Sequence, residues 1–464
     1  MTGLQHLENF KRSLPTGALC AFQKPHRLQK PSTKHGRDMF GQASVDGADH
    51  TLWNTGPGNM LSTMLSMAGY PEGSQAIHRA FFANTVAPSL GRHPAGSGID
   101  ESEWKSFMTD DNTPLELSWS WPAAQATPVV RYSVEPIGWG AGTASDPLNT
   151  HASVELLRQT PPLALGVDLT WYRYFLTTLT VPSISHHELG QHGYETLKDA
   201  GALSQSFIAF DLQNNSMVAK YYFMPALKAR VTGKTTLEAV QEAIFGLPGG
   251  AGDSFAAPLK AVSDYMHSLP PSDRPVVEIV AIECMDPSKS RIKVYIRSQK
   301  TSFADMLDVM TLGGRTEPLS DKARAEIAEL WCAVFGIGKT DKALSDSSLL
   351  QQRKHRTAGL LYYLELKPNM AHPKSKVYLP ARHYADNDDR IAHDLSNFLS
   401  KRGKGLVGCD YYAGVTRLFR HGKLADGLGF HTYITCTIDG DGPVVTVYLN
   451  PGKCGSGIRG TVRS

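Results

Sequence analysis

A short stretch at residues 291–298, RIKVYIRS, alternates strictly between two kinds of side chain. One set is apolar and consists of Ile292, Val294 and Ile296. The other set is cationic or phenolic and consists of Arg291, Lys293, Tyr295 and Arg297. Because successive strand side chains point to opposite faces, the stretch predicts a β-strand with one apolar and one cationic face. A half-buried strand ordinarily turns small polar or mixed-charge residues to water, so this cationic face indicates a more specific partner.

Alternating segments of this kind recur along the chain. They are found at residues 115–121, 129–136, 207–212, 217–224, 277–284, 291–298, 375–381, 431–438 and 444–450. Several follow one another across polar or glycine-containing turns, which is typical of antiparallel hairpins. Amphipathic helices are expected between the pairs, for example from the capping box at Thr235 to Gly246 and from Ser320 to Gly336. This order argues against a parallel sheet built from strict βαβ units.

Three strands repeat a lysine and a tyrosine two residues apart, and therefore on one face. The pairs are Lys220 with Tyr222, Lys293 with Tyr295, and Lys376 with Tyr378, and the set is extended by Arg131, Tyr433 and Tyr448. In an open sheet this face would lie in water. In a closed barrel it would line the lumen, while the apolar faces would pack outward on helices.

Composition limits the classes of protein that the chain can belong to. Of the 464 residues 41% are hydrophobic and 20% charged, which is typical of a soluble globular protein. A formal net charge of +3 gives no general case for binding nucleic acid, and no apolar run approaches the ~20 residues of a membrane span. The six cysteines form no CxxC pair, which favours reduced thiols in the cytoplasm over a zinc site. Residues 1–38 are predicted to be a poorly ordered basic arm, and residues 39–464 a single domain.

Three motifs suggest other chemistry, and each has a simpler explanation. In HHELGQH (residues 186–192), His187 and His192 are five apart and diverge by about 140° on a helix, so a zinc site is not expected. TGKTT (232–236) lacks the upstream glycines of a phosphate-binding loop and is interpreted as a helix cap. DNDDR (386–390) resembles a magnesium-binding aspartate motif, but acidic residues also favour the start of a helix.

A cationic, tyrosine-bearing lumen without a metal motif suits a ligand with a polyanionic head group. Arginine binds phosphate oxygens with a two-pronged fork, lysine adds a mobile charge, and tyrosine rings stabilise a cation. The alternative is that each lysine–tyrosine pair is a solvated strand face. Glu116 lies among apolar neighbours, where a buried carboxylate can act as a general base, although a surface or salt-bridged glutamate is an equal alternative.

Several sequence blocks resemble the fungal dimethylallyl-tryptophan synthase family. They are TPLELS, VVRYSVEPI with GTASDPLNTH, AKYYFMPALKARVTGK, PSKSRIKVYIRSQ, DVMTLGGR and VAPSLGRHP, within residues 53–448. The resemblance implies an α+β fold, the ABBA prenyltransferase barrel of ten antiparallel strands inside a ring of helices. It also implies transfer of a dimethylallyl group from an allylic diphosphate to an aromatic ring in secondary metabolism. The diphosphate is a co-substrate, no cofactor is required and no metal is essential.

By this resemblance, Glu116 is the base that accepts a hydrogen bond from an indole N–H or its equivalent. The residues implied to bind diphosphate and shield the allylic cation are Arg131, Lys220, Tyr222, Arg291, Lys293, Tyr295, Lys376, Tyr378, Tyr433 and Tyr448. Arg297 shares the face of Arg291 but lies near the strand end, so its placement in the lumen or in solvent is left open.

Departures from the family pattern bear on the acceptor. Lys376 replaces the usual Gln, while Asp439 and Val444 stand where relatives can carry Arg and Tyr. Phe207 and Glu278 occupy positions that are cationic in enzymes acting on free tryptophan, which removes an anchor for an amino-acid carboxylate. The favoured acceptor is an indole derivative such as a tryptophan-containing cyclic dipeptide or an indole alkaloid.

Two alternatives are a polycyclic phenol as the acceptor and a non-catalytic barrel that binds an anion. The expected partners are the small-molecule acceptor and the diphosphate, with neither nucleic acid nor membrane. The expected assembly is a monomer or homodimer.

Overall fold

The computed structural model describes residues 47–94, 104–160, 166–337, 350, 353–419, 423–440 and 442–454. Residues from Ser44 to Ser464 group into one compact unit. The basic arm predicted for residues 1–38 lies outside the described residues, so it stays a prediction.

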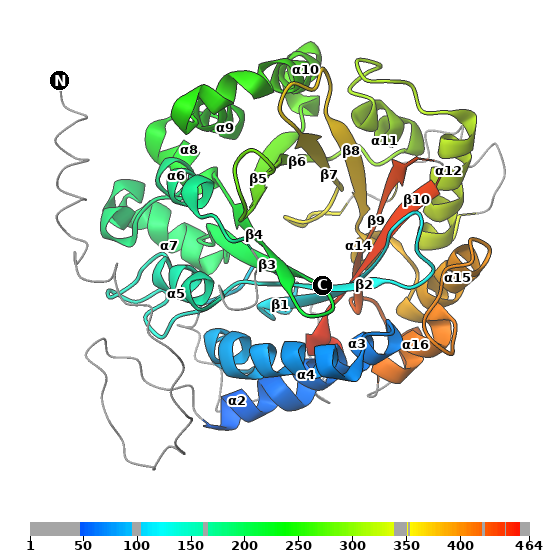
Figure 1. Cartoon of the computed structure of the whole chain (residues 1–464). Helices are drawn as coiled ribbons and strands as arrows, with labels where there is room; N and C mark the ends of the chain where they lie inside the picture. The colour runs from blue at the N-terminus through cyan, green and yellow to red at the C-terminus, as the bar shows by residue number, and fades with distance from the viewer. Residues whose placement is uncertain are drawn as a thin grey trace, which may run out of the picture. The chain divides into compact units, whose positions relative to one another are not determined.

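Ten antiparallel strands form a closed barrel at the centre of this unit (Figure 1). They are β1 (Leu115–Trp121), β2 (Val129–Val134), β3 (Ser206–Leu212), β4 (Met217–Phe223), β5 (Val276–Glu283), β6 (Ile292–Ser298), β7 (Leu360–Leu366), β8 (Lys374–Leu379), β9 (His431–Asp439) and β10 (Gly442–Leu449). Each strand pairs with its sequence neighbours, and β1 pairs with β10 to complete the circle. Nine of the strands match the alternating segments, whereas β7 was missed by the sequence reading. The predicted α+β barrel is confirmed.

Helices lie around the outside of the strands (Figure 1). The α-helices are α2 (Gly47–Trp53), α3 (Asn59–Met67), α4 (Glu72–Phe81), α5 (His151–Gln159), α6 (Thr170–Leu179), α7 (Gln191–Asp199), α8 (Ala226–Thr232), α9 (Thr236–Phe245), α10 (Ala256–Ser268), α11 (Phe303–Met310), α12 (Asp321–Phe335), α14 (Ala381–Tyr384), α15 (Asp388–Ser400) and α16 (Tyr411–Leu418). Among the helices of the described part, none combines the length and the apolarity that crossing a bilayer requires.

The buried side chains of the strands form two separate clusters, and strands β3 and β5 to β9 contribute to both. Ile292, Val294 and Ile296 belong to the large outer core that includes helix residues such as Trp331. Tyr295, between them in sequence, belongs to an inner cluster. The members of the inner cluster are Met108, Phe207, Ile279, Ala281, Tyr295, Leu361, Tyr378 and Tyr433. The alternation therefore separates outer core from lumen, as expected for a closed barrel and not for an open sheet.

Strand direction sets the height of each lumen side chain. In an antiparallel barrel the even-numbered strands β4, β6 and β8 all run the same way. Their Lys-x-Tyr segments consequently place the three lysines toward one end and the three tyrosines one step further along. Arg291 directly precedes β6, and Lys293, Tyr295 and Arg297 follow in order along the strand, so these side chains lie at successive heights.

The motifs that suggested other chemistry have local structural roles. Thr235 and Glu238 form a complete capping box at the start of α9. Asn387 caps α15 by accepting a hydrogen bond from the Arg390 N–H, which supports the helix-start reading of DNDDR. Asp388 is buried and accepts hydrogen bonds from the backbone N–H groups of Phe430 and His431 at 3.0 and 2.8 Å, which fixes the start of β9.

The histidine-rich motif is a short helical turn. Residues Ser183–Leu189 form a 3-10 helix, and α7 follows from Gln191. The Nδ1 atoms of His186 and His187 donate to the carbonyl oxygens of Ser183 and Ile184, at 3.0 and 3.1 Å. These local bonds account for both rings without a metal ion.

Candidate active site

Five cationic side chains define the cation layer at one end of the lumen: Arg131, Lys220, Arg291, Lys293 and Lys376. Arg131 and Lys220 flank the carboxylate of Asp211, with Nε and Nζ at 3.3 and 2.5 Å from its Oδ2 atom. Ladder register explains this contact, because Arg131 pairs directly with Asp211 across β2 and β3. Burial opposes ionisation of Asp211, but the two cations outweigh it and hold its pKa well below the usual range.

Arg291 is held between two further carboxylates. Its Nη2 atom lies 2.7 Å from Glu283 Oε1, and its Nη1 atom lies 2.9 Å from Glu365 Oε2. Both acids are buried and come from the neighbouring strands β5 and β7. The guanidinium is therefore fixed in position, while about a third of its side chain stays exposed.

The two central lysines of the layer lack such close carboxylate partners. Burial, followed by the charges of Lys220 and Arg291, lowers the pKa of Lys293 to about 7. Lys376 donates to the Thr446 hydroxyl at 3.0 Å, and burial together with Arg131 lowers its pKa well below the usual value. Both ammonium groups would gain from a nearby anion, because the layer holds five cationic groups against three carboxylates.

Five phenol rings define the tyrosine layer one step further along the strands: Tyr222, Tyr295, Tyr363, Tyr378 and Tyr448. Neighbouring ring centres around Tyr295 are 5.6 to 6.0 Å apart, and the Tyr378 and Tyr448 centres are 5.8 Å apart. Burial raises the pKa of Tyr448 to about 12, so its phenol stays neutral at physiological pH. The rings offer π-faces to a cation that lies beside the cation layer.

Glu116 lies on the lumen face of β1, beyond the tyrosine layer. Its Oε1 atom accepts a hydrogen bond from the Thr432 hydroxyl. Burial raises the pKa of Glu116 to about 7, although the hydrogen bond from Thr432 and the charge of Arg382 oppose the rise. A carboxyl group with this pKa exchanges a proton readily at neutral pH, as a general base must.

Arg297, whose placement the sequence left open, is inside the protein. Only 6% of the residue is exposed. Its Nε and Nη2 atoms donate to the two carboxylate oxygens of Glu278 at 2.7 and 2.9 Å. Its Nη1 atom faces the Thr357 carbonyl at 3.0 Å and the Tyr433 hydroxyl at 3.4 Å. This salt bridge keeps the charged side chain stable in the interior, so the solvent alternative is wrong.

Sequence reasoning missed several side chains at the site. They are Asp211, Glu283 and Glu365 in the cation layer, Tyr363 in the tyrosine layer and Arg382 beside Tyr433. Tyr363 and Glu365 both lie on β7, whose segment LLYYLEL carries leucine and tyrosine on both faces and so gives only a weak alternation signal. Asp439, by contrast, lies at the end of β9 and pairs with Lys374 at 2.8 Å, on the exposed side of the hairpin.

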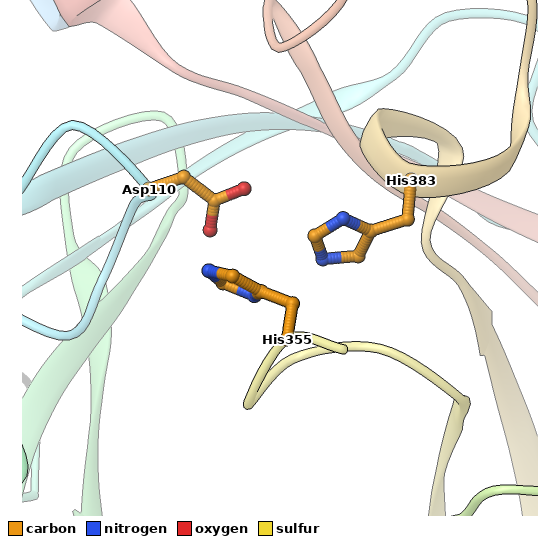
Figure 2. A group of neighbouring side chains, drawn as sticks. All are labelled: Asp110, His355 and His383. Atoms are coloured by element: carbon orange, nitrogen blue, oxygen red, sulfur yellow. The ribbon is translucent and has the colours of Figure 1, made fainter. Parts of the chain in front are cut away.

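Asp110, His355 and His383 point toward one another from three different segments (Figure 2). Their potential ligand atoms all lie within 4.8 Å of one another. The Thr357 hydroxyl bridges the two imidazoles at 2.8 and 2.7 Å. Burial and then the charge of Arg382 lower the pKa of His383 to about 4, so its imidazole is neutral at physiological pH.

The closed ten-stranded barrel, with cations and tyrosines stacked inside it, defines the class of ABBA aromatic prenyltransferases. AnaPT from Neosartorya fischeri superposes with a TM-score of 0.73 at 22% identity, over 89% of this chain and 96% of that chain. NotF, in a complex with brevianamide F and DMSPP, has a TM-score of 0.71 at 20% identity, over 88% and 96% of the two chains.

The family model for tryptophan dimethylallyltransferase matches residues 49–413, and the chain belongs to this family. It is 48% identical to a 4-O-dimethylallyl-L-tyrosine synthase of Claviceps purpurea, over 91% of this chain and 92% of the relative. It is 31% identical to a 7-dimethylallyltryptophan synthase of Aspergillus fumigatus, over 86% and 84%. The protein is an aromatic prenyltransferase, as the sequence predicted.

Proposed function

We propose that the protein transfers a dimethylallyl group from dimethylallyl diphosphate to the phenolic oxygen of a tyrosine-like acceptor. The observation that carries this proposal is the order of groups along the lumen. Cations come first, neutral phenol rings second, and Glu116 with a pKa near neutrality third. This order matches the leaving group, the allylic cation and the acceptor in sequence.

Ionisation of the donor takes place at the cation layer. The bond between the allylic carbon and oxygen breaks, and the electron pair leaves with diphosphate. Arg291 is held between two carboxylates and Arg131 is paired with Asp211, so both guanidinium groups are already in place to stabilise the growing charge. Lys293 and Lys376, whose pKa values are lowered in the free enzyme, become fully charged beside the anion. These cations take the place of a metal ion in neutralising the leaving group.

The tyrosine layer then shields the allylic cation from water. Its rings contribute about 0.5–2 kcal/mol each where water is excluded. The acceptor oxygen attacks the cation, a carbon–oxygen bond forms, and the phenolic proton passes to the Glu116 carboxylate. Glu116 accepts a hydrogen bond from the Thr432 hydroxyl and is attracted by the charge of Arg382. These two interactions keep its carboxylate oriented toward the lumen.

The choice of acceptor rests on relatives together with the site. The relative at 48% identity is named for a phenolic oxygen of tyrosine, an acceptor that is neither the indole derivative first favoured nor the polycyclic phenol given as an alternative. An indole acceptor remains the second candidate, because a relative at 31% identity is named for tryptophan. In that case Glu116 would accept the hydrogen bond of the indole N–H.

An acceptor panel tests this proposal. Enzyme, dimethylallyl diphosphate and one of L-tyrosine, L-tryptophan or a tryptophan-containing cyclic dipeptide are incubated, and products are analysed by mass spectrometry and NMR. We expect the highest kcat/KM with tyrosine and attachment at the phenolic oxygen. A preference for an indole carbon would support the second candidate, and no product at all would favour the non-catalytic barrel. Cytoplasmic location and a monomeric or homodimeric state stay predictions, which fractionation and sedimentation can test.

A further inference from the structure

Arg382 is a buried cation that the proposed chemistry has not used. It lies in α14, directly after β8, four residues beyond Tyr378. Only 3% of its side chain is exposed. Its Cζ atom lies 4.7 Å from the centre of the Tyr433 ring, and its Nη2 atom donates to the Tyr433 hydroxyl at 3.3 Å. Arg382 therefore borders the lumen at the end opposite to the cation layer.

Most of the hydrogen-bonding capacity of Arg382 is unused. Its Nε and Nη1 atoms are buried and make no hydrogen bond to any residue within the described ranges. Asp110 approaches Nε at 3.4 Å with a carboxylate that is 40% exposed. Buried polar atoms nearly always have partners, so a buried guanidinium with open donors indicates a missing ligand.

The neighbouring arginine does not share this property. The Nε and Nη2 atoms of Arg297 are both engaged by Glu278, and Nη1 faces the carbonyl oxygens of Thr357 and Ala358. Glu278 therefore neutralises Arg297 inside the protein, whereas Arg382 keeps two buried nitrogen atoms with open donors.

The surroundings of Arg382 favour an anion. Burial, together with nearby arginine charges, lowers the pKa of both His355 and His383, so both imidazoles stay neutral beside Arg382. A carboxylate fits the guanidinium fork with two parallel hydrogen bonds. The charge of Arg382 also acts on Glu116, the proposed base, where it opposes the rise of the pKa that burial causes. An aromatic acceptor with a carboxylate on its side chain could thus reach both groups.

We propose that Arg382 binds the α-carboxylate of an aromatic amino-acid acceptor and that Asp110 receives its α-ammonium group. This inference rests on the proposed aromatic prenyl transfer and assigns the residues that select an acceptor with a free α-carboxylate. The sequence argued against free amino-acid acceptors because Phe207 and Glu278 cannot bind a carboxylate. Arg382 would supply the missing carboxylate-binding group from another position.

Binding to the enzyme loaded with dimethylallyl S-thiolodiphosphate, an unreactive donor analogue, tests the inference without turnover. Calorimetry compares L-tyrosine with tyramine, which lacks the carboxylate, and with 3-(4-hydroxyphenyl)propanoate, which lacks the amine. We expect tyramine to bind about 10- to 100-fold more weakly than tyrosine, the range for losing hydrogen bonds to a charged group. The propanoate should lose less affinity than tyramine.

Variants assign this discrimination to the residue. Arg382→Gln should weaken tyrosine binding about 10- to 100-fold and leave tyramine nearly unchanged, so that the two ligands become equal. Arg382→Lys should recover part of the difference, because it restores the charge without the fork. Arg158→Gln, at an exposed arginine of α5 that is 77% exposed, serves as the control and should change neither ligand.

The outcomes separate this inference from the proposed function. Equal affinity of wild-type enzyme for tyrosine and tyramine would overturn the carboxylate anchor, even if both are prenylated. Retained discrimination in a folded Arg382→Gln variant would overturn the assignment to Arg382. Failure to prenylate any aromatic acceptor, with tyrosine still bound more tightly than tyramine, would overturn the proposed function alone.

Discussion

Lys293 places its Nζ atom 5.0 Å from the centre of the Tyr363 ring, across the ladder between β6 and β7. This contact joins the cation layer to the tyrosine layer. Burial, followed by the charges of Lys220 and Arg291, lowers the pKa of Lys293 to about 7, so its charge responds to pH near neutrality.

Lys293 should make donor binding dependent on pH. Its pKa of about 7 in the free enzyme means that it loses its charge as pH rises above 7. A bound diphosphate raises that pKa, so binding at pH 8 should take up protons, and affinity should fall between pH 7 and 9. Calorimetry with the thiolodiphosphate in buffers of different ionisation enthalpy measures both effects.

The Lys293→Met variant identifies the responsible group. It should bind the thiolodiphosphate about 10- to 100-fold more weakly and take up fewer protons. Lys260→Met, at a lysine that is 73% exposed on α10, is the control. Unchanged affinity in Lys293→Met would contradict the place of this lysine in the cation layer.

Glu116 should control the acidic side of the pH–rate profile. With a pKa of about 7 the carboxylate form predominates only above pH 7, so kcat/KM for the acceptor should rise as pH increases through 7. Glu116→Gln should retain donor binding, lose about 100- to 10,000-fold in turnover and lose this pH dependence. The exposed Glu188, substituted by Gln, is the control. Near-normal turnover in Glu116→Gln would rule out the role of base.

The ring of Tyr378 should protect the allylic cation from water. It lies 5.8 Å from both the Tyr295 and Tyr448 ring centres, in the middle of the tyrosine layer. Tyr378→Phe keeps a π-face and should preserve the ratio of prenylated product to dimethylallyl alcohol. Tyr378→Ala admits water and should shift that ratio toward the alcohol about 2- to 30-fold. Chromatography of both products measures the ratio, and an unchanged ratio in Tyr378→Ala would refute the shielding role.

Thr235 should affect stability but not donor binding. It caps α9 and belongs to the capping box with Glu238. Thr235→Ala should lower the free energy of unfolding by about 1 kcal/mol, as measured by urea denaturation. A loss of diphosphate affinity in this variant would instead indicate that residues 232–236 bind phosphate.

The fold was predictable because alternation is a local property. RIKVYIRS and the other segments specify two faces each, but an open sheet with its cationic face in water and a closed barrel both agree with that pattern. β7 was missed because its segment has tyrosines and leucines on both faces, so the contrast between faces is weak. The family resemblance, and not periodicity, supplied the count of ten strands.

The site was predictable only where residues repeat a pattern. The Lys-x-Tyr pairs were visible because the same short pattern recurs in three separate segments. Asp211, Glu283 and Glu365 are partners across the ladder, and their role follows from pairing that the sequence does not display. Arg382 was missed because it lies in a four-residue helix outside any alternating segment. Its location depends on how the chain turns after β8.

The most direct test of the central claim couples donor ionisation to acceptor prenylation. Enzyme is dialysed against EDTA and incubated with dimethylallyl diphosphate and L-tyrosine, and released diphosphate and prenylated tyrosine are measured together. Arginine and lysine side chains supply the charge, so we predict one prenylated product for each diphosphate released, with Arg291→Gln slowing both equally. Diphosphate release without any prenylated aromatic product, or a strict need for added metal, would contradict the account.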